Sequence, residues 1–221
     1  MGSFRPGPLW YLFLALFTPL VVVGAIDTVS QMFGNWTDYL WLALGIVLFF
    51  LLEKYVIKGK DDTIRTFSHE LNHAVVSLLM FKKVHAFHVE GERGQVSHTA
   101  GGRFSSVLIS LAPYCLPLCT YALLLVRAVM LPDLYWCVDI LAGVTVGFYI
   151  SVFREQTGNY ETDINRYRHL VFPYWYIFTF LIFNTGIVLY SLLPEKNVFL
   201  AFADTFVGYW HYLGDFFRWL F

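Results

Sequence analysis

Five apolar stretches of this chain are long enough to cross the hydrocarbon core of a membrane. That core is about 30 Å thick, so a spanning helix needs roughly 20 predominantly apolar residues. The stretches are residues 9–26, 39–57, 105–131, 134–153 and 174–193. Inside lipid, a chain must satisfy its backbone hydrogen bonds internally, which only helices and closed barrels achieve. The pattern therefore predicts an all-α polytopic membrane protein.

The composition agrees with a membrane environment. Hydrophobic residues make up 57% of the 221 residues and charged residues 14%, whereas soluble domains have about 45–50% apolar and about 25% charged residues. The net charge is −1, so no excess of one sign indicates a nucleic-acid partner. The lipid bilayer is the partner that the composition predicts.

Two features modify the simple count of spans. Residues 198–221 place aromatic and aliphatic side chains at helical spacing with charges between them, so this helix either spans or lies in the interface, and we expect five to six transmembrane helices. Pro113 and Pro117 should kink or interrupt the third stretch. Asp139 is costly in lipid, so it should face the bundle interior or sit near the outer end of its helix.

Two further segments are too polar to be spans. Residues 64–81 have a helical pattern with polar residues near the start, and residues 84–99 alternate loosely around Gly91, as a small β-hairpin does. We therefore expect a single membrane-embedded domain over residues 1–221. It would comprise N-terminal spans (1–60), a core with the polar helix, the hairpin and two spans (61–170), and C-terminal spans (171–221).

The most specific chemical motif lies in the predicted polar helix. It reads His69-Glu70-Leu71-Asn72-His73, and residues four apart share one helix face, so both imidazoles can reach one metal ion. This is the H-E-x-x-H pattern of zinc hydrolases, in which the glutamate is the general base. It would occur in roughly one of a hundred shuffled chains of this composition. We predict Zn²⁺ at the two histidines and Glu70 as the catalytic base.

A hydrolytic zinc site needs one more protein ligand and an open position. We predict Asp163, which stands in a polar stretch after the fourth apolar run. The competing donors are His85, His88, His98, Glu161 and His169. An alternative is that both histidines of the motif are satisfied core groups, although ionisable groups clustered on a membrane-protein helix are costly without a metal or partners.

The basic residues predict which side of the membrane the site faces. The third and fourth apolar runs cross out and back, which returns Asp163 to the side of the hairpin. The metal helix must then be only partly inserted, because a complete crossing would separate His69 from Asp163. Twelve of the 15 Lys and Arg residues would share this side, and such an excess indicates the cytoplasmic face. They are Arg5, Lys54, Lys58, Lys60, Arg65, Lys82, Lys83, Arg93, Arg103, Arg154, Arg166 and Arg168.

Residues 67–163 resemble the M50 family of metallopeptidases, the site-2-protease-like intramembrane enzymes, and within it the M50B-like members. The resemblance rests on Phe67-Ser68-His69-Glu70-Leu71-Asn72-His73-Ala74, then a short apolar helix, a glycine-containing hairpin and a long span. It implies that His69, His73 and Asp163 bind zinc and that Glu70 is catalytic. It also implies that the hairpin presents an extended substrate by strand addition. The chain departs from the family pattern at Asn72, where a small residue is common, and at Thr162-Asp163-Ile164, where the family has Leu-Asp-Gly with a nearby Asn-Pro motif.

We therefore expect a zinc-dependent endopeptidase that cleaves membrane proteins or peptides within or near the bilayer. No PDZ-like domain is recognisable in the sequence, so an exosite of that kind would require an adaptor protein. Two alternatives stay open. One is a catalytically inactive pseudoprotease that binds transmembrane helices, and the other is a small transporter with His69, Glu70 and Asp139 along a polar path.

Overall fold

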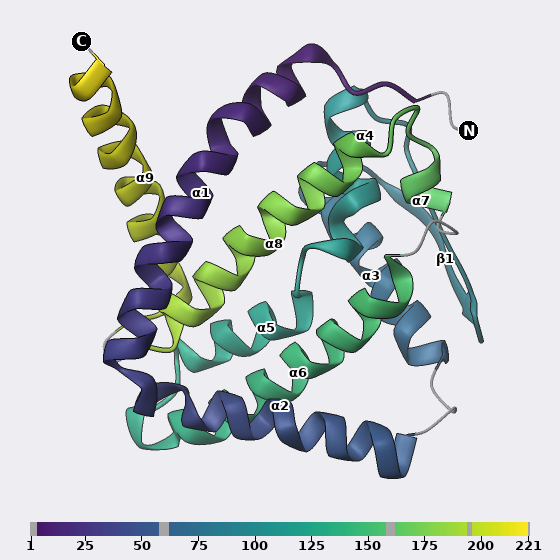
Figure 1. The fold of residues 1–221 in the computed structure, drawn as a ribbon. Coiled ribbons are helices and arrows are strands. Elements are labelled where there is room, and N and C mark those ends of the chain that lie inside the picture. Colours follow the sequence, from purple (N-terminus) through teal and green to yellow (C-terminus); the bar gives the residue numbers. More distant parts are fainter. Residues whose placement is uncertain (1–3, 58–61, 158–161, 194–195, 221) are drawn as a thin grey trace. The chain divides into compact units, whose positions relative to one another are not determined.

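The computed structural model describes residues 4–57, 62–157, 162–193 and 196–220. Most of these residues are helical (Figure 1), and the prediction of an all-α polytopic membrane protein is confirmed. The helices and strands in chain order are α1 (Pro8–Gly34), α2 (Leu40–Leu52), α3 (Asp62–Leu79), β1 (Val84–Glu90), β2 (Arg93–His98), α4 (Arg103–Leu111), α5 (Leu118–Arg127), α6 (Tyr135–Gln156), α7 (Thr162–Asn165), α8 (Val171–Ser191) and α9 (Val198–Leu220). Short 3₁₀ turns at Trp36–Tyr39, Ala112–Tyr114 and Pro132–Leu134 and a π-helical turn at Glu53–Ile57 extend or join them.

Four helical stretches are long and apolar enough to cross a membrane. They are Pro8–Gly34, Trp36–Val56, Pro132–Gln156 and Val171–Ser191. A fifth candidate is the pair Arg103–Tyr114 and Leu118–Arg127, which bends by 82° between its halves. Pro113 and Pro117 lie at this break, where proline removes a backbone donor and clashes with the preceding turn. The predicted interruption of the third span is therefore confirmed.

Two longer helices of the described chain, α3 and α9, are not among the candidate spans. Helix α9 carries Asp204, Asp215 and Arg218 between its apolar residues, which lowers its hydropathy. Within the described residues the number of candidate spans is thus four, or five with the bent pair, and the larger number is the lower end of the predicted five to six.

The chain folds into two compact units, each assembled from distant parts of the sequence. Unit 1 comprises Met1–Leu14, Leu51–Leu116 and Ile150–Phe178, and unit 2 comprises Ala15–Phe50, Pro117–Tyr149 and Thr179–Phe221. Each unit contains residues from all three predicted segments, 1–60, 61–170 and 171–221. The reason is that long helices such as α1 begin in one unit and end in the other.

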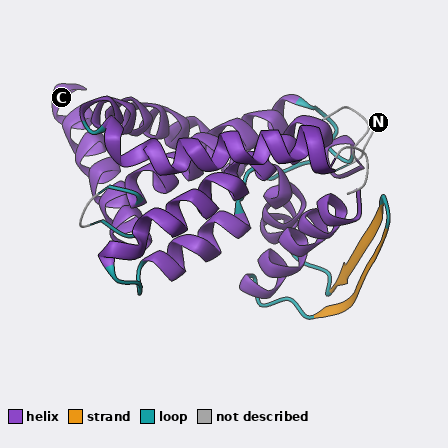
Figure 2. Cartoon of the chain, turned by 90° about the horizontal axis from the view of Figure 1, so that it is seen from below, coloured by secondary structure: helices purple, strands orange, loops and turns teal. Residues whose placement is uncertain are grey.

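Unit 1 contains α3 packed against the hairpin and against α4. The two antiparallel strands, orange in Figure 2, pair from Val84 opposite His98 to Glu90 opposite Arg93. Gly91 has a φ of 58° in the turn between them, a conformation that glycine adopts without the steric cost of a Cβ. The predicted hairpin is therefore confirmed. On the α4 side, Val76 packs with Ile109 in a small apolar core.

Unit 2 is held by a larger apolar core and by one buried ion pair. A Cβ at Gly45 of α2 would collide with the backbone of α6 at Ile140 and Gly143, so these helices approach closely because both glycines lack side chains. Asp139 is 4% exposed, and its Oδ1 accepts a 2.8 Å hydrogen bond from Nε of Arg127. The prediction that Asp139 faces the interior is confirmed.

Candidate metal centre

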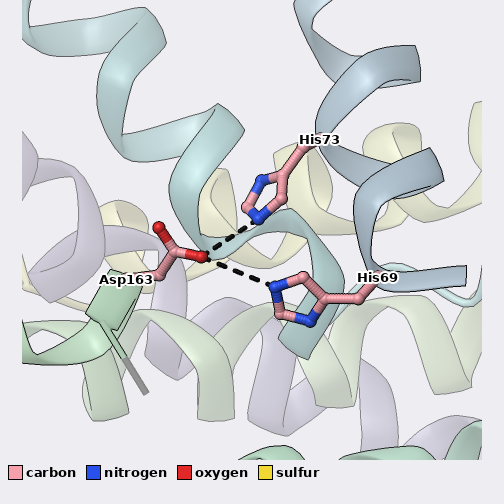
Figure 3. A group of neighbouring side chains, drawn as sticks. All are labelled: His69, His73 and Asp163. Carbon is pink, nitrogen blue, oxygen red and sulfur yellow. Dashed lines mark hydrogen bonds and ion pairs between the residues drawn. The ribbon is translucent and has the colours of Figure 1, made fainter. Parts of the chain in front are cut away.

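Helix α3 presents both histidines of the H-E-x-x-H motif on one face. His69 and His73 are 8% and 9% exposed, and their ring centroids lie 4.8 Å apart. The two side chains lie one turn apart because the helix repeats about every 3.6 residues. Figure 3 shows that both rings point toward the same carboxylate.

That carboxylate belongs to Asp163, in the first turn of the short helix α7. Its Oδ2 lies 3.0 Å from Nε2 of His73 and 3.5 Å from Nε2 of His69 (Figure 3). Among the His, Cys, Asp and Glu residues that the structure describes, these three form the one group whose possible ligand atoms all lie within 4.8 Å of one another. Residues 90 positions apart thus converge on one point.

The outer nitrogens of the two rings have their own partners. Nδ1 of His73 donates to the backbone oxygen of Ile109 at 2.7 Å, and Nδ1 of His69 lies 2.9 Å from Oε1 of Gln156. An oxygen of this kind can only accept, so both Nδ1 atoms carry a proton. Nε2 of each ring faces Asp163, where a protonated ring donates to the carboxylate and a neutral ring offers a lone pair to a cation. Two lone pairs and a carboxylate oxygen that face one point are a donor set suited to a cation.

The electrostatics of the cluster keep Asp163 ionised. Burial by itself raises the pKa of Asp163, but the hydrogen bonds and positive charge of His69 and His73 outweigh it and hold that pKa well below its usual range. Burial lowers the pKa of His69, whereas its hydrogen bonds to Asp163 and Gln156 and the charge of Asp163 raise it overall. An ionised carboxylate is therefore available as a ligand at neutral pH.

Glu70 lies between the two histidines in sequence and is 9% exposed. Burial raises its pKa, the charges of His73 and His69 oppose this shift, and the charge of Asp163 adds to it. The backbone of β2 passes directly over this side chain, since a Cβ at Gly94 would collide with Cγ and Oε1 of Glu70. Glycine at this position permits the hairpin to cover the carboxylate.

An open pocket of about 420 Å³ adjoins the cluster. Its walls come from β2, the turn that follows it, α4 and α7, and Glu70, His73 and Asp163 line it as well. The three chemically active side chains are therefore accessible from one common space.

A set of ion pairs joins α3 to the end of α6. Arg65 of α3 pairs with Glu53 at 2.8 Å and also with Glu155, and Glu53 accepts a hydrogen bond from Ser151. These contacts bring the last turn of α6, with Gln156, to His69. The sequence does not predict that Gln156 and Arg65 support the site, because polar residues at the ends of apolar helices are common and carry no specific signal.

The competing donors that the structure describes do not join the cluster. Of those that the structure describes, His85 and His88 are exposed on β1, His98 lines the pocket, and His169 lies in a separate pocket. Glu161 lies outside the described residues. The structure therefore brings together the four predicted site residues, while their roles stay predictions.

Comparison with models of protein families gave a match. The family model described as Peptidase M50B-like matches residues 39–154, just over half of the chain. The matched part includes α3 with its motif and the hairpin, whereas Asp163 and Gln156 lie beyond its end. Comparison with the curated proteins gave no match, and neither did comparison with the solved structures.

Proposed function

The chain belongs to the Peptidase M50B-like family, and from this premise we propose that it is a membrane-embedded zinc endopeptidase. Four or five candidate spans accompany the family match, so it is an integral membrane protein. The observation that carries the proposal is the convergence of His69, His73 and Asp163 beside Glu70.

The donor set fits zinc. Two imidazole nitrogens and one carboxylate oxygen are ordinary zinc ligands, and three protein ligands leave one position free, as in catalytic zinc sites. His69 and His73 would bind through Nε2, and Asp163 through Oδ2. When bound, Zn²⁺ supplies a Lewis acid that polarises a substrate carbonyl and lowers the pKa of water.

Glu70 would move the proton. As a water oxygen attacks the carbonyl carbon of the scissile peptide, the Glu70 carboxylate accepts a proton from that water. It then donates the proton to the leaving amide nitrogen as the C–N bond breaks. Burial raises the pKa of Glu70, which makes the carboxylate a stronger base than an exposed glutamate.

The substrate would be a membrane protein or peptide in extended conformation. Strand β2 forms one wall of the pocket, and an extended peptide that lay along it could pair with its backbone, by strand addition. An adaptor protein that presents such a substrate remains a prediction from the sequence.

Replacing Glu70 tests the mechanism. Glu70→Gln keeps the shape of the side chain but cannot accept a proton, so we expect unchanged zinc content and a fall in kcat of about 100-fold or more. Zinc is measured by mass spectrometry and cleavage with a fluorogenic transmembrane peptide in liposomes. Removing zinc with a chelator should abolish cleavage by the wild type, and adding zinc back should restore it.

A matched control is Glu92→Gln in the exposed turn of the hairpin, which should leave cleavage unchanged. Undiminished cleavage by Glu70→Gln would refute the role assigned to this residue.

One observation favours a second candidate, a pseudoprotease that binds transmembrane helices without cleaving them. Asp163 lies outside the family match and in a sequence context that departs from the family pattern. This candidate predicts that the purified wild type lacks stoichiometric zinc and that Glu70→Gln binds the same helices equally well. The transporter alternative is less favoured, because Arg127 occupies the Asp139 carboxylate.

A further inference from the structure

The pocket beside the metal centre contains a cation that the proposed chemistry does not use. Arg166 lines this pocket together with Glu70, His73 and Asp163. It follows Asp163 by three residues, just after the end of α7. None of the ion pairs found among the described residues includes Arg166. Its charge is therefore available to a group that enters the pocket.

The N-terminal segment holds Arg166 in place. The guanidinium carbon lies 4.9 Å from the ring centroid of Phe4, a cation–π contact. Backbone hydrogen bonds fix Phe4 on both sides, from its N–H to Arg166 O at 3.1 Å and from the N–H of Arg168 to Phe4 O at 3.0 Å. A guanidinium that is already oriented loses less entropy when it binds an anion.

The neighbouring residue anchors the same segment. The Tyr167 ring, 1% exposed, stands edge-on to Phe4 at 5.2 Å between ring centroids. Its hydroxyl lies 2.8 Å from Oγ of Ser110 on α4. Phe4 and Tyr167 thus tie the Arg166 backbone to the wall of the pocket.

Apart from two carboxylates, the other polar groups of the pocket can donate hydrogen bonds to an anion. Glu70 and Asp163 are the acidic lining residues, and the proposed mechanism assigns them to the base and the metal. The remaining groups include the hydroxyls of Ser106 and Thr162 and the imidazole of His98, all of which can donate hydrogen bonds.

We propose that Arg166 forms a subsite for a substrate carboxylate close to the scissile bond. The inference rests on the proposed peptidase function. The planar guanidinium can bind a carboxylate through two parallel hydrogen bonds. The carboxylate could be the side chain of an Asp or Glu residue or the free C-terminus of the substrate, and the two sources share this chemistry.

Synthetic transmembrane peptides test the subsite. One set carries a single Glu, moved through the positions on both sides of the cleaved bond, with an amidated C-terminus. A second set has Gln in its place, and a third has Gln with a free C-terminus a short distance after the cleaved bond. For the wild type we expect either the Glu set or the set with a free C-terminus to be cleaved with a kcat/KM about tenfold higher than the amidated Gln set, mainly through a lower KM. The set that is preferred identifies the source of the carboxylate.

Variants of Arg166 should change this preference. Arg166→Ala should abolish it, and Arg166→Lys, which keeps the charge but loses the two-pronged geometry, should retain part of it. Arg168→Ala is the matched control. It also removes one arginine charge, but the Arg168 side chain lines a different pocket. It should leave the preference unchanged.

Binding separates this inference from the proposed function. Each peptide is also titrated against the Glu70→Gln protein, with and without Arg166→Ala, by fluorescence anisotropy. Tighter binding of a carboxylate-bearing peptide that disappears with Arg166→Ala supports the subsite even if no peptide is cleaved. Equal binding of all three sets, unaffected by Arg166→Ala, overturns it even if the wild type cleaves every peptide.

Discussion

At the scale of single residues, the imidazole of His69 is oriented from both of its nitrogens. Nε2 faces Asp163, while Nδ1 donates to Oε1 of Gln156 at 2.9 Å. A partner of this kind fixes the tautomer and the ring orientation of a ligating histidine. We therefore expect Gln156 to be a positioning residue for the candidate metal centre rather than a ligand.

Replacing Gln156 tests this role. Gln156→Ala should weaken zinc affinity by about 10–100-fold, because the ring loses its acceptor. Gln156→Glu should retain the affinity, since a carboxylate oxygen accepts the same hydrogen bond. Affinity is measured by competition with a chromophoric chelator. Gln95→Ala on the exposed face of β2 is the control, and zinc affinity equal to wild type in Gln156→Ala would contradict the assignment.

Gly94 of β2 lies against the side chain of Glu70 and constrains its position. A Cβ at this position would collide with Glu70 and with Cγ2 of Thr66, so either the hairpin or the glutamate must shift. We expect Gly94→Ala to lower kcat by roughly 10–100-fold with zinc content unchanged, since small displacements of a catalytic group are costly. The control is Gly7→Ala, where a Cβ meets nothing within 4 Å. Unchanged kcat in Gly94→Ala would show that the hairpin accommodates the methyl group without moving Glu70.

At the scale of helices, one ion pair joins three elements of unit 2. Besides Asp139 of α6, the Arg127 guanidinium binds the backbone oxygens of Ser191 and Leu192 at 2.9 and 3.1 Å, at the end of α8. Carbonyls at the end of a helix lack donors from a following helical turn, so they are available to accept from this guanidinium. Arg127, in the last turn of α5, therefore ties the ends of α5 and α8 to the start of α6.

Removing the Asp139 carboxylate should destabilise the contact between the ends of α5 and α8 and the start of α6. Asp139→Ala leaves a guanidinium that is 4% exposed without its counter-charge, and we expect a loss of about 3–5 kcal/mol in the free energy of unfolding. Denaturant unfolding in detergent micelles measures this. Asp133→Ala in the exposed turn before α6 should have little effect. If Arg127→Met with Asp139→Ala is no more stable than Asp139→Ala alone, the unpaired charge is not the cause.

At the scale of the whole molecule, the basic residues divide between the two units. Of the twelve that the sequence places on one side of the membrane, the ten that the structure describes all belong to unit 1. The remaining three, Arg127, Lys196 and Arg218, belong to unit 2. The unit that contains the candidate metal centre thus carries most of the basic residues, and from the positive-inside rule we expect this unit to face the cytoplasm.

Cysteine labelling tests this orientation. In a protein with Cys115, Cys119 and Cys137 replaced by alanine, we expect Glu92→Cys in the hairpin turn to react with a membrane-impermeant maleimide only from the cytoplasmic side. Asp133→Cys, between α5 and α6, should react only from the opposite side. The extent of maleimide labelling is measured in right-side-out and in inside-out membrane vesicles. The reverse pattern would place the site at the other face of the membrane.

The sequence was most informative where the signal is local. The spacing of His69 and His73 is enough to place both on one face of α3, because helical geometry depends only on sequence separation. The hairpin was predictable from its alternation and from Gly91, whose positive φ matches the turn. Pro113 and Pro117 marked the break in the third span for an equally local reason.

The partners that complete the site were harder to predict. Asp163 could be proposed by chain topology but not distinguished by spacing from His98 or His169. Gln156 and the carbonyl of Ile109 carried no signal at all, since a glutamine at a helix end and a backbone oxygen are ordinary features of any chain.

The sequence by itself therefore determined the membrane as solvent, the helical class and the placement of His69 and His73 on one face of one helix. Apolar runs and a four-residue spacing act over one or two turns of chain, so they can be interpreted without coordinates. Only the tertiary structure decided that Asp163 and Gln156 reach His69, that β2 lies over Glu70 and that Arg166 lines the same pocket. Such contacts join residues tens of positions apart, and they depend on how whole helices pack rather than on any local pattern.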